Sequence, residues 1–152
     1  MKEKIEFPTE GLERYQEWTK YNPDSFTKWS YLRNEVRAED VVLLTTLLWP
    51  NFIEIDGIVF LAENFNEKTY RKQKRKAHWN ASEYGAIVNH IHLEDAFNED
   101  DIPPHCVMVY IGKIMRQMWE CRLSTLFAKK AFVVTLDCSV EYKEYVISFK
   151  EV

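Results

Sequence analysis

The chain has 152 residues, of which 46% are hydrophobic, 14% aromatic and 29% charged. This length suits one domain, expected over residues 1–152, and the composition excludes disorder over any long stretch. The net charge of -4 and an isoelectric point near 5.6 argue mildly against duplex nucleic acid as a partner of the whole chain.

The first third of the chain predicts three helices. Two of them show aromatic and apolar residues three or four positions apart, namely Leu12, Tyr15 and Trp18 in the first and Phe26, Trp29, Leu32 and Val36 in the second. The third, residues 39–49, opens with two acidic residues and is apolar on nearly every side. A helix that is apolar all round is normally buried, so we expect this one to lie in the core and to end at Pro50.

Residues 52–61 predict a β-hairpin. Two four-residue apolar stretches flank Asp56-Gly57, a dipeptide that suits the two-residue type I′ turn. The register that follows pairs four residues on one wholly apolar face, Ile55 with Ile58 and Ile53 with Phe60. Because the other face is also mostly apolar, we expect the hairpin to be covered on both sides.

Helical signals return after this hairpin. Asn66 is expected to cap a strongly charged helix that runs to about Trp79, and another helix follows through Tyr84 and on to Phe97. Two prolines then start the longest helix, expected over about residues 105–128. The apolar stripe of this longest helix is expected to comprise Val107, Ile111, Ile114, Met115, Met118 and Cys121.

Residues 131–150 predict a second antiparallel hairpin. Apolar residues alternate in two runs around a polar turn, with Phe132, Val134 and Leu136 in the first run and Tyr145, Ile147 and Phe149 in the second. The sequence therefore predicts an α+β fold, in which the hairpins at about 52–61 and 131–150 form one four-stranded antiparallel sheet packed with five or six helices.

Cysteine usage and the N-terminal sequence bear on location. Cys106, Cys121 and Cys138 have no repeated spacing, and their odd number argues against a disulfide framework, so we expect reduced thiols in the cytoplasm. The N-terminal residues show no secretory-type apolar stretch, and the longest apolar run, 41–49, is interrupted by two threonines. We therefore expect neither a signal peptide nor a membrane span.

Residues 68–76 carry the highest local concentration of positive charge in the chain. This run contains six cations, Lys68, Arg71, Lys72, Lys74, Arg75 and Lys76, beside one acidic neighbour, Glu67. Such a run could grip phosphates, with Tyr70, His78 and Trp79 available to stack on bases. Because the cations are spaced around a whole helix, the favoured interpretation is a solvated basic helix that faces acidic surface elsewhere, such as the acidic residues between 94 and 101.

Histidine and carboxylate side chains form a candidate enzyme site. On the helix expected here, one stripe would comprise Glu83, Ile87, His90 and Glu94, with His92 nearby. A carboxylate, histidine and carboxylate in a row could hold a divalent metal. The spacings typical of metal sites are absent, however, and one helix supplies too few ligands, so we predict no metal and no cofactor.

Two further side chains are candidates for chemistry. Cys106 follows His105 at the start of the longest helix, where the helix dipole favours a thiolate. No third orienting group is identifiable for this pair, so a buried, inert Cys106 is favoured. Arg122 interrupts the apolar stripe, and it is expected to snorkel to the helix edge, to line a pocket for an anionic ligand or, as the favoured interpretation, to pair with a carboxylate.

Common enzyme templates are missing. Only four glycines are present, and neither a Gly-x-Ser-x-Gly elbow nor a paired metal motif occurs. The leading hypothesis is therefore a protein-binding module without catalytic activity, acting as an adaptor, an inhibitor or a neutralising partner of a more basic protein. The first alternative is a small-molecule or metal-dependent enzyme at His90, His92, Glu94 or Cys106, and the second is phosphate or nucleic-acid binding through residues 68–76.

Tryptophans either fill cores or anchor a binding surface, and the sequence alone does not separate these two roles. Of the five present, Trp18 and Trp79 have the most polar neighbours, so if any tryptophan is exposed we expect it to be one of these two. No residue pattern specifies the partner protein or an oligomeric state.

Overall fold

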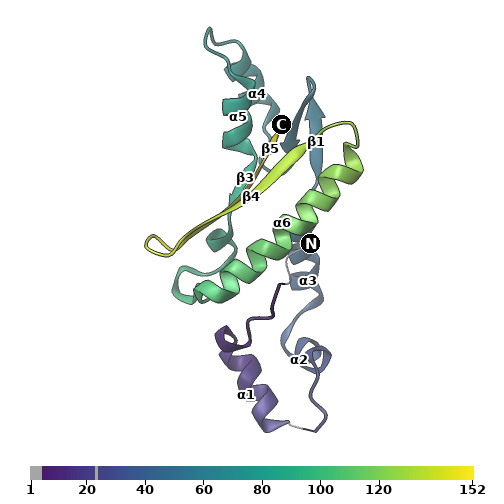
Figure 1. Ribbon diagram of the computed structural model, residues 1–152, viewed down its shortest axis with the longest axis vertical. Helices are drawn as coiled ribbons and strands as arrows, with labels where there is room; N and C mark the ends of the chain where they lie inside the picture. Colours follow the sequence, from purple (N-terminus) through teal and green to yellow (C-terminus); the bar gives the residue numbers. More distant parts are fainter. Residues whose placement is uncertain (1–4, 23) are drawn as a thin grey trace.

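The computed structural model describes residues 5–22 and 24–152. Helices, a hairpin, further helices, a short strand, a long helix and a second hairpin follow one another along the chain (Figure 1). The α-helices are α1 (Glu13–Tyr21), α2 (Lys28–Glu35), α3 (Ala38–Leu48), α4 (Glu67–Lys74), α5 (Ala81–Val88) and α6 (His105–Leu126). The strands are β1 (Phe52–Ile55), β2 (Ile58–Leu61), β3 (His90–His92), β4 (Phe132–Ser139) and β5 (Glu144–Glu151). Short 3-10 helices are η1 (Thr9–Gly11), η2 (Leu93–Ala96) and η3 (Glu99–Asp101).

The mixture of helices and strands confirms the predicted α+β class, but the prediction of one four-stranded sheet is wrong. β1 and β2 form a two-stranded sheet, and a separate antiparallel sheet has the order β3, β5, β4. Strand β3 comes from residues that the sequence assigns to a helix, and it pairs His90 with Ser148 of β5. At the edge of β2, the side chain of Asn89 takes two backbone groups, Leu61 N and Val59 O, that a neighbouring strand would otherwise bond.

The β1–β2 hairpin has the predicted register, with Ile55 opposite Ile58 and Ile53 opposite Phe60. Positive φ angles at both turn residues, 53° at Asp56 and 80° at Gly57, fit a type I′ turn. Both faces of the hairpin are covered, as the sequence predicts. One face joins the core around α6, and the other packs on Tyr70 of α4 and Tyr84 of α5.

A buried asparagine joins this hairpin to the three-stranded sheet. Asn89 is 4% exposed and lies between α5 and β3. Its Oδ1 accepts a hydrogen bond from Leu61 N at 3.0 Å, and its Nδ2 donates to Val59 O at 3.0 Å. The backbone carbonyl of Asn89 accepts from Phe149 N of β5 at 3.0 Å. One residue therefore bonds to both sheets.

Helix α6 occupies almost the predicted range and is central to the core. Its buried residues are Val107, Met108, Gly112, Met115, Trp119 and Leu123. Cys121, which the sequence assigns to the buried stripe, is exposed. The stripe is rotated because β4 approaches the helix at Gly112, where an added Cβ would lie 2.5 Å from Leu136 Cδ1. Within the described residues, no helix has both the length and the apolar character needed to cross a membrane.

The molecule is elongated, with α1 and α2 at one end, away from the two sheets (Figure 1). No described residue of α1, α2 or α3 is buried. Helices α1 and α2 are linked by an ion pair between Arg14 and Glu35 and by ring contacts of Tyr15 with Phe26 and Tyr31. The prediction of a buried helix over residues 39–49 is therefore wrong.

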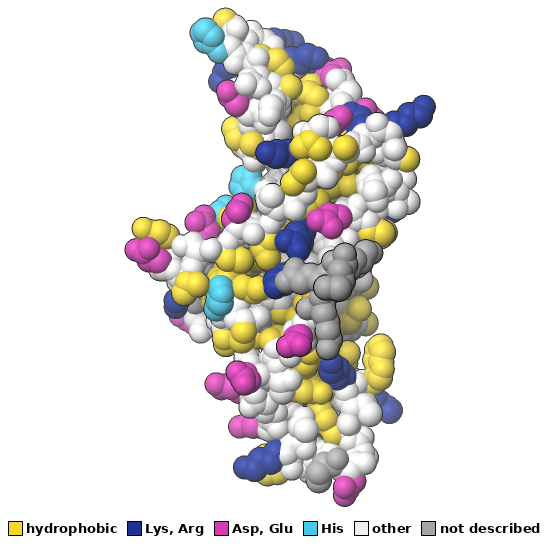
Figure 2. All heavy atoms as spheres, in the orientation of Figure 1, with side chains coloured by type: hydrophobic (Ala, Val, Ile, Leu, Met, Phe, Trp, Pro, Cys, Tyr) yellow, Lys and Arg dark blue, Asp and Glu magenta, His cyan; other side chains and the backbone are white. Residues whose placement is uncertain are grey.

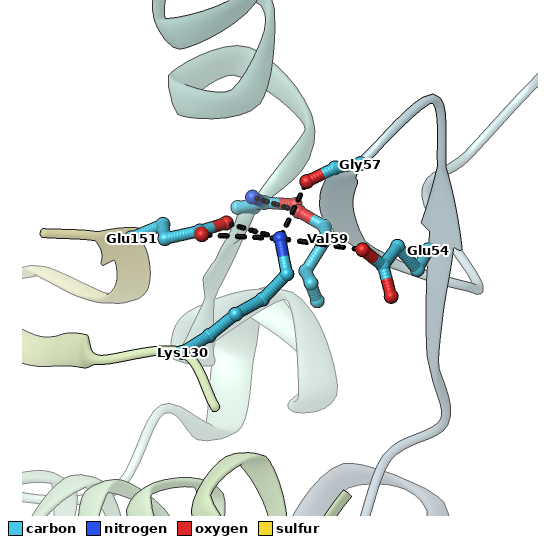
Figure 3. A network of polar contacts seen from close by, with 6 residues as sticks. Glu54, Gly57, Val59, Lys130 and Glu151 are labelled. Atoms are coloured by element: carbon cyan, nitrogen blue, oxygen red, sulfur yellow. Dashed lines mark hydrogen bonds and ion pairs between the residues drawn. The ribbon is translucent and has the colours of Figure 1, made fainter. Parts of the chain in front are cut away.

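A lysine links the tip of the β1–β2 hairpin to the end of β5. Lys130 Nζ donates to the Gly57 carbonyl at 2.5 Å and lies 3.0 Å from Glu151 and 3.3 Å from Glu54 (Figure 3). The side chain of Lys130 is 20% exposed. Its hydrogen bond to Glu151, more than the one to Glu54, raises the pKa of Lys130, so the ammonium form is stabilised.

Candidate functional site

The two histidines of the predicted enzyme site lie on a strand, which corrects the predicted helical stripe. Because β3 is extended, His90 and His92 project on the same side, with ring centroids 5.3 Å apart. His92 Nδ1 lies 3.2 Å from Glu94 Oε1 and 3.6 Å from Glu144 Oε1, whereas His90 Nδ1 lies 3.0 Å from the Ala86 carbonyl oxygen. Among the described side chains, no group of three or more His, Cys, Asp or Glu is placed to hold a metal ion.

Glu94 connects His92 to a second polar group at the same end of the sheet. Glu94 Oε2 accepts a hydrogen bond from the Tyr145 backbone N–H at 3.0 Å, and the Tyr145 hydroxyl lies 3.0 Å from His105 Nδ1. Burial, followed by the nearby Cys138 and Glu94, raises the pKa of Tyr145. The hydroxyl therefore stays neutral and joins the start of α6 to β5.

The remaining candidates, Cys106 and Arg122, lie on α6. Cys106 is exposed in the first turn of α6, contrary to the prediction that it is buried. Its sulfur lies beside η1, where a Cβ added to Gly11 would be 2.8 Å away. Arg122 is separated from Cys106 by about 24 Å of helix. The structure therefore brings His90, His92 and Glu94 together and leaves Arg122 at a distance.

The basic run forms α4 and the turn after it, and all six cations are exposed. Two of them pair with nearby acids, Arg71 with Glu67 at 2.5 Å and Lys74 with Asp56 at 2.6 Å. Asp56 also accepts a hydrogen bond from the buried Tyr70 hydroxyl at 2.8 Å. The bonds from Lys74 and then Tyr70 lower the pKa of Asp56. These acidic partners are local and differ from those that the sequence suggests.

A cleft of about 530 Å³ opens between α4 and α5. Its lining includes Lys76, His78, Trp79 and His90. Trp79 is only partly exposed because its ring packs on Tyr70 and Tyr84, so the prediction of an exposed Trp79 is wrong. The side chains of Lys76 and His78 form no hydrogen bond or ion pair with other described residues, so both are available to a ligand.

Helix α3 exposes apolar side chains on all sides. Val41, Val42, Leu43 and Leu44 are 50%, 63%, 66% and 51% exposed, and four consecutive helical positions cover the whole circumference. Only the C-terminal end of α3 packs on α6, where the Leu47 carbonyl accepts a hydrogen bond from Trp119 Nε1 at 3.0 Å. We call Val41, Val42, Leu43 and Leu44, together with Trp49, the α3 surface. Figure 2 shows further hydrophobic side chains at the surface in the lower part of the molecule, over the N-terminal helices.

Arg122 lies at the C-terminal end of the α3 surface. Its guanidinium carbon is 5.4 Å from the centre of the Trp49 ring, within the range of a cation–π contact. Arg122 Nε is buried and has no hydrogen-bond partner in the described part of the chain. The favoured carboxylate pair thus does not form among the described residues. Trp29 and Trp49, at 79% and 39% exposure, are the exposed tryptophans in place of Trp18.

No protein-family model matches the chain, and no curated protein and no solved structure shows significant similarity to it. Only the geometry of the described residues therefore bears on the function of the chain. In that geometry the α3 surface is the feature that departs furthest from the rule that apolar helices are covered.

Proposed function

We propose that the protein is a protein-binding module and that the α3 surface is where it binds its partner. The observation that carries this proposal is a run of four aliphatic residues, each at least half exposed, on a helix with no buried residue. Contiguous exposed apolar patches mark interaction sites in soluble proteins. The module would act through binding alone, as an adaptor, an inhibitor or a neutralising partner.

Burial of the α3 surface would supply binding free energy. Burying an exposed Val or Leu side chain completely is worth about 1.5–3 kcal/mol, so covering the exposed half of each of the four gives about 4 kcal/mol in total. Trp49 and Arg122 add an aromatic ring and a guanidinium, which are residue types enriched where binding energy concentrates. These terms offset part of the entropic cost of association.

The enzyme alternative has less support in the geometry. A catalytic site needs a nucleophile, a base and a binding group within reach of one another. His90 and His92 each lie beside a local partner, and Cys106 is exposed next to η1. Protein binding requires no such convergence, so it accounts for the observed arrangement with fewer assumptions.

Affinity capture with the tagged 152-residue chain tests the proposal. Leu43→Lys places a charge in the middle of the α3 surface and should reduce capture of the specific partner at least about tenfold. Ile87→Lys is the matched control, because Ile87 is 68% exposed on α5 and lies outside that surface. If the Leu43→Lys chain captures the same proteins as the wild type, the α3 surface is not the binding site.

A second candidate function is binding of single-stranded nucleic acid along α4. It is favoured by four cations that form no ion pair among the described residues, Lys68, Lys72, Arg75 and Lys76. Lys76 also lines the cleft that contains Trp79, on which a base could stack. Gel mobility with single-stranded RNA at low salt tests it. Binding that weakens about tenfold in Lys72→Glu would support it, and unchanged RNA mobility would exclude it.

A further inference from the structure

We infer that the partner at the α3 surface is a second copy of this chain, docked so that the two α3 helices run antiparallel about a two-fold axis. The inference rests on the proposed protein-binding function and names the occupant of its site. A two-fold interface requires a self-complementary surface, in which a group at one end matches a group at the other. The α3 surface meets this requirement in its charges and in its apolar middle.

The N-terminal end of α3 carries two acids, Glu39 and Asp40, beside one base, Arg37, whereas the base Arg122 lies at the other end. Glu39 lies in the first turn of α3, is exposed, and its side chain forms no hydrogen bond or ion pair with another described residue. Arg122 lies at the other end, over Trp49; its Nε is buried, and its side chain forms no ion pair with another described residue. The helix between Glu39 and Trp49 spans about 15 Å, so Glu39 does not reach Arg122 of its own chain.

An antiparallel second copy brings these two groups together. A two-fold axis through the middle of α3 places Glu39 of each copy near Arg122 of the other, so the same pair forms twice. Antiparallel helix dipoles also attract. A parallel arrangement would instead place the two Glu39 side chains side by side, where they would repel. The charge pattern therefore selects the antiparallel orientation.

The apolar middle of the surface also suits a second copy. The exposed aliphatic side chains of α3 point around the helix, so one isolated partner helix would cover only one side. A whole second chain brings more apolar cover, because exposed residues also lie on the elements next to α3, with Trp29 at 79% and Leu32 at 43% on α2 and Leu126 at 43% on α6. An interface of this composition has an apolar centre and a charged rim.

The molar mass of the full chain, measured by light scattering from ~1 to ~100 µM, tests the inference. The mass should rise with concentration from 18.2 kDa towards twice that value. Leu43→Lys should weaken self-association at least about 100-fold, because it places two charges in the apolar centre. Ile87→Lys should leave self-association within about twofold of the wild type, since Ile87 lies on α5.

Charge reversal tests the orientation. Glu39→Arg and Arg122→Glu should each weaken the dimer about tenfold, and their combination should restore it to within about threefold. Because Arg122 also packs on Trp49, thermal unfolding must show that its variant is folded. Glu39→Gln, which leaves Arg122 intact, should weaken the dimer about threefold.

Two results would overturn the inference: a mass that stays at 18.2 kDa up to ~100 µM, or a dimer that Leu43→Lys leaves intact. The same variants also show whether only the dimer is wrong or the proposed protein-binding function as well. A monomeric chain that still captures another protein in a Leu43-dependent way would retain the function and lose the second copy as partner. A chain that neither self-associates nor captures another protein through Leu43 would exclude both the second copy as partner and the proposed function.

Discussion

Asn89 carries two hydrogen bonds that water cannot replace, because it is 4% exposed and both partners are backbone groups of β2. In the sequence it is one polar residue inside a stretch with helical periodicity, and nothing separates it from exposed asparagines. Its role depends on β2, which lies about thirty residues earlier in the chain. Residue-level chemistry of this kind follows from tertiary structure and could not be predicted from local pattern.

Asn89→Ala should lower the free energy of unfolding by about 2–4 kcal/mol, because Leu61 N and Val59 O would both lose a buried partner. Urea denaturation measures this change. Asn64→Ala is a matched control, since Asn64 also donates to two carbonyl groups but is exposed, and water can replace its bonds. It should cost less than about 1 kcal/mol. Equal losses in the two variants would contradict the role given to Asn89.

Asp56→Asn should change the pH dependence of stability. The pKa of Asp56 is lowered from 3.8, first by Lys74 and then by Tyr70, so the carboxylate stabilises the fold above that ordinary value. This contribution is lost as the pH falls through the lowered folded pKa. The wild type should therefore be more stable than Asp56→Asn near neutral pH, and the difference should shrink between about pH 5 and pH 2.

Urea midpoints measured across this range check the prediction. Asparagine tolerates the positive φ of 53° at this position, so the turn is kept and only the charge is removed. A difference between the two proteins that stays constant with pH would show that the Asp56 carboxylate contributes through the turn and not through its charge.

At the scale of elements, the β1–β2 hairpin was predictable because all its signals are local. The turn dipeptide and the four paired residues fall within ten positions, and the register depends on nothing else. Strand β3 was not predictable for the opposite reason. It has three residues, its flanks show helical spacing, and its partner β5 lies more than fifty positions away. The predicted arrangement of the histidine site was wrong for the same reason, because a strand and a helix place different residues side by side.

The buried face of α6 was also predicted only in part. The helix range follows from the prolines before it and from its periodicity, but neighbouring stripes of this helix are all partly apolar. The absence of a side chain at Gly112 allows β4 to approach and decides which stripe is buried. Cys121 therefore becomes exposed, and Arg122 reaches Trp49 of α3.

Lys130→Met should weaken the link between the two sheets. The ammonium group bonds to Gly57, Glu151 and Glu54, and its removal leaves two carboxylates close together without a cation. We expect a loss of about 1–3 kcal/mol in the free energy of unfolding. Lys129→Met, next in sequence and exposed, is the control and should change stability by less than about 0.5 kcal/mol. A loss as small in Lys130→Met as in the control would show that the link does not stabilise the fold.

For the whole molecule, the main feature is that its two ends differ in how far their residues are buried. The sheets and α6 share a continuous core, whereas α1, α2 and α3 contain no buried residue. The sequence predicts apolar cover for α3, because residues 41–44 leave no polar side. It does not indicate whether that cover comes from the same chain. The exposure of α3 in the folded chain leads to the proposal that another chain provides it.

Amide hydrogen exchange of α3 in the 152-residue chain, compared at ~1 and ~100 µM, shows whether a second copy covers this helix. If a second copy covers the α3 surface, the amides of residues 38–48 should exchange at least about tenfold more slowly at the higher concentration. Those of α5 should be unaffected. Exchange in α3 that is equally fast at both concentrations would contradict the account, because no second chain would then protect that helix.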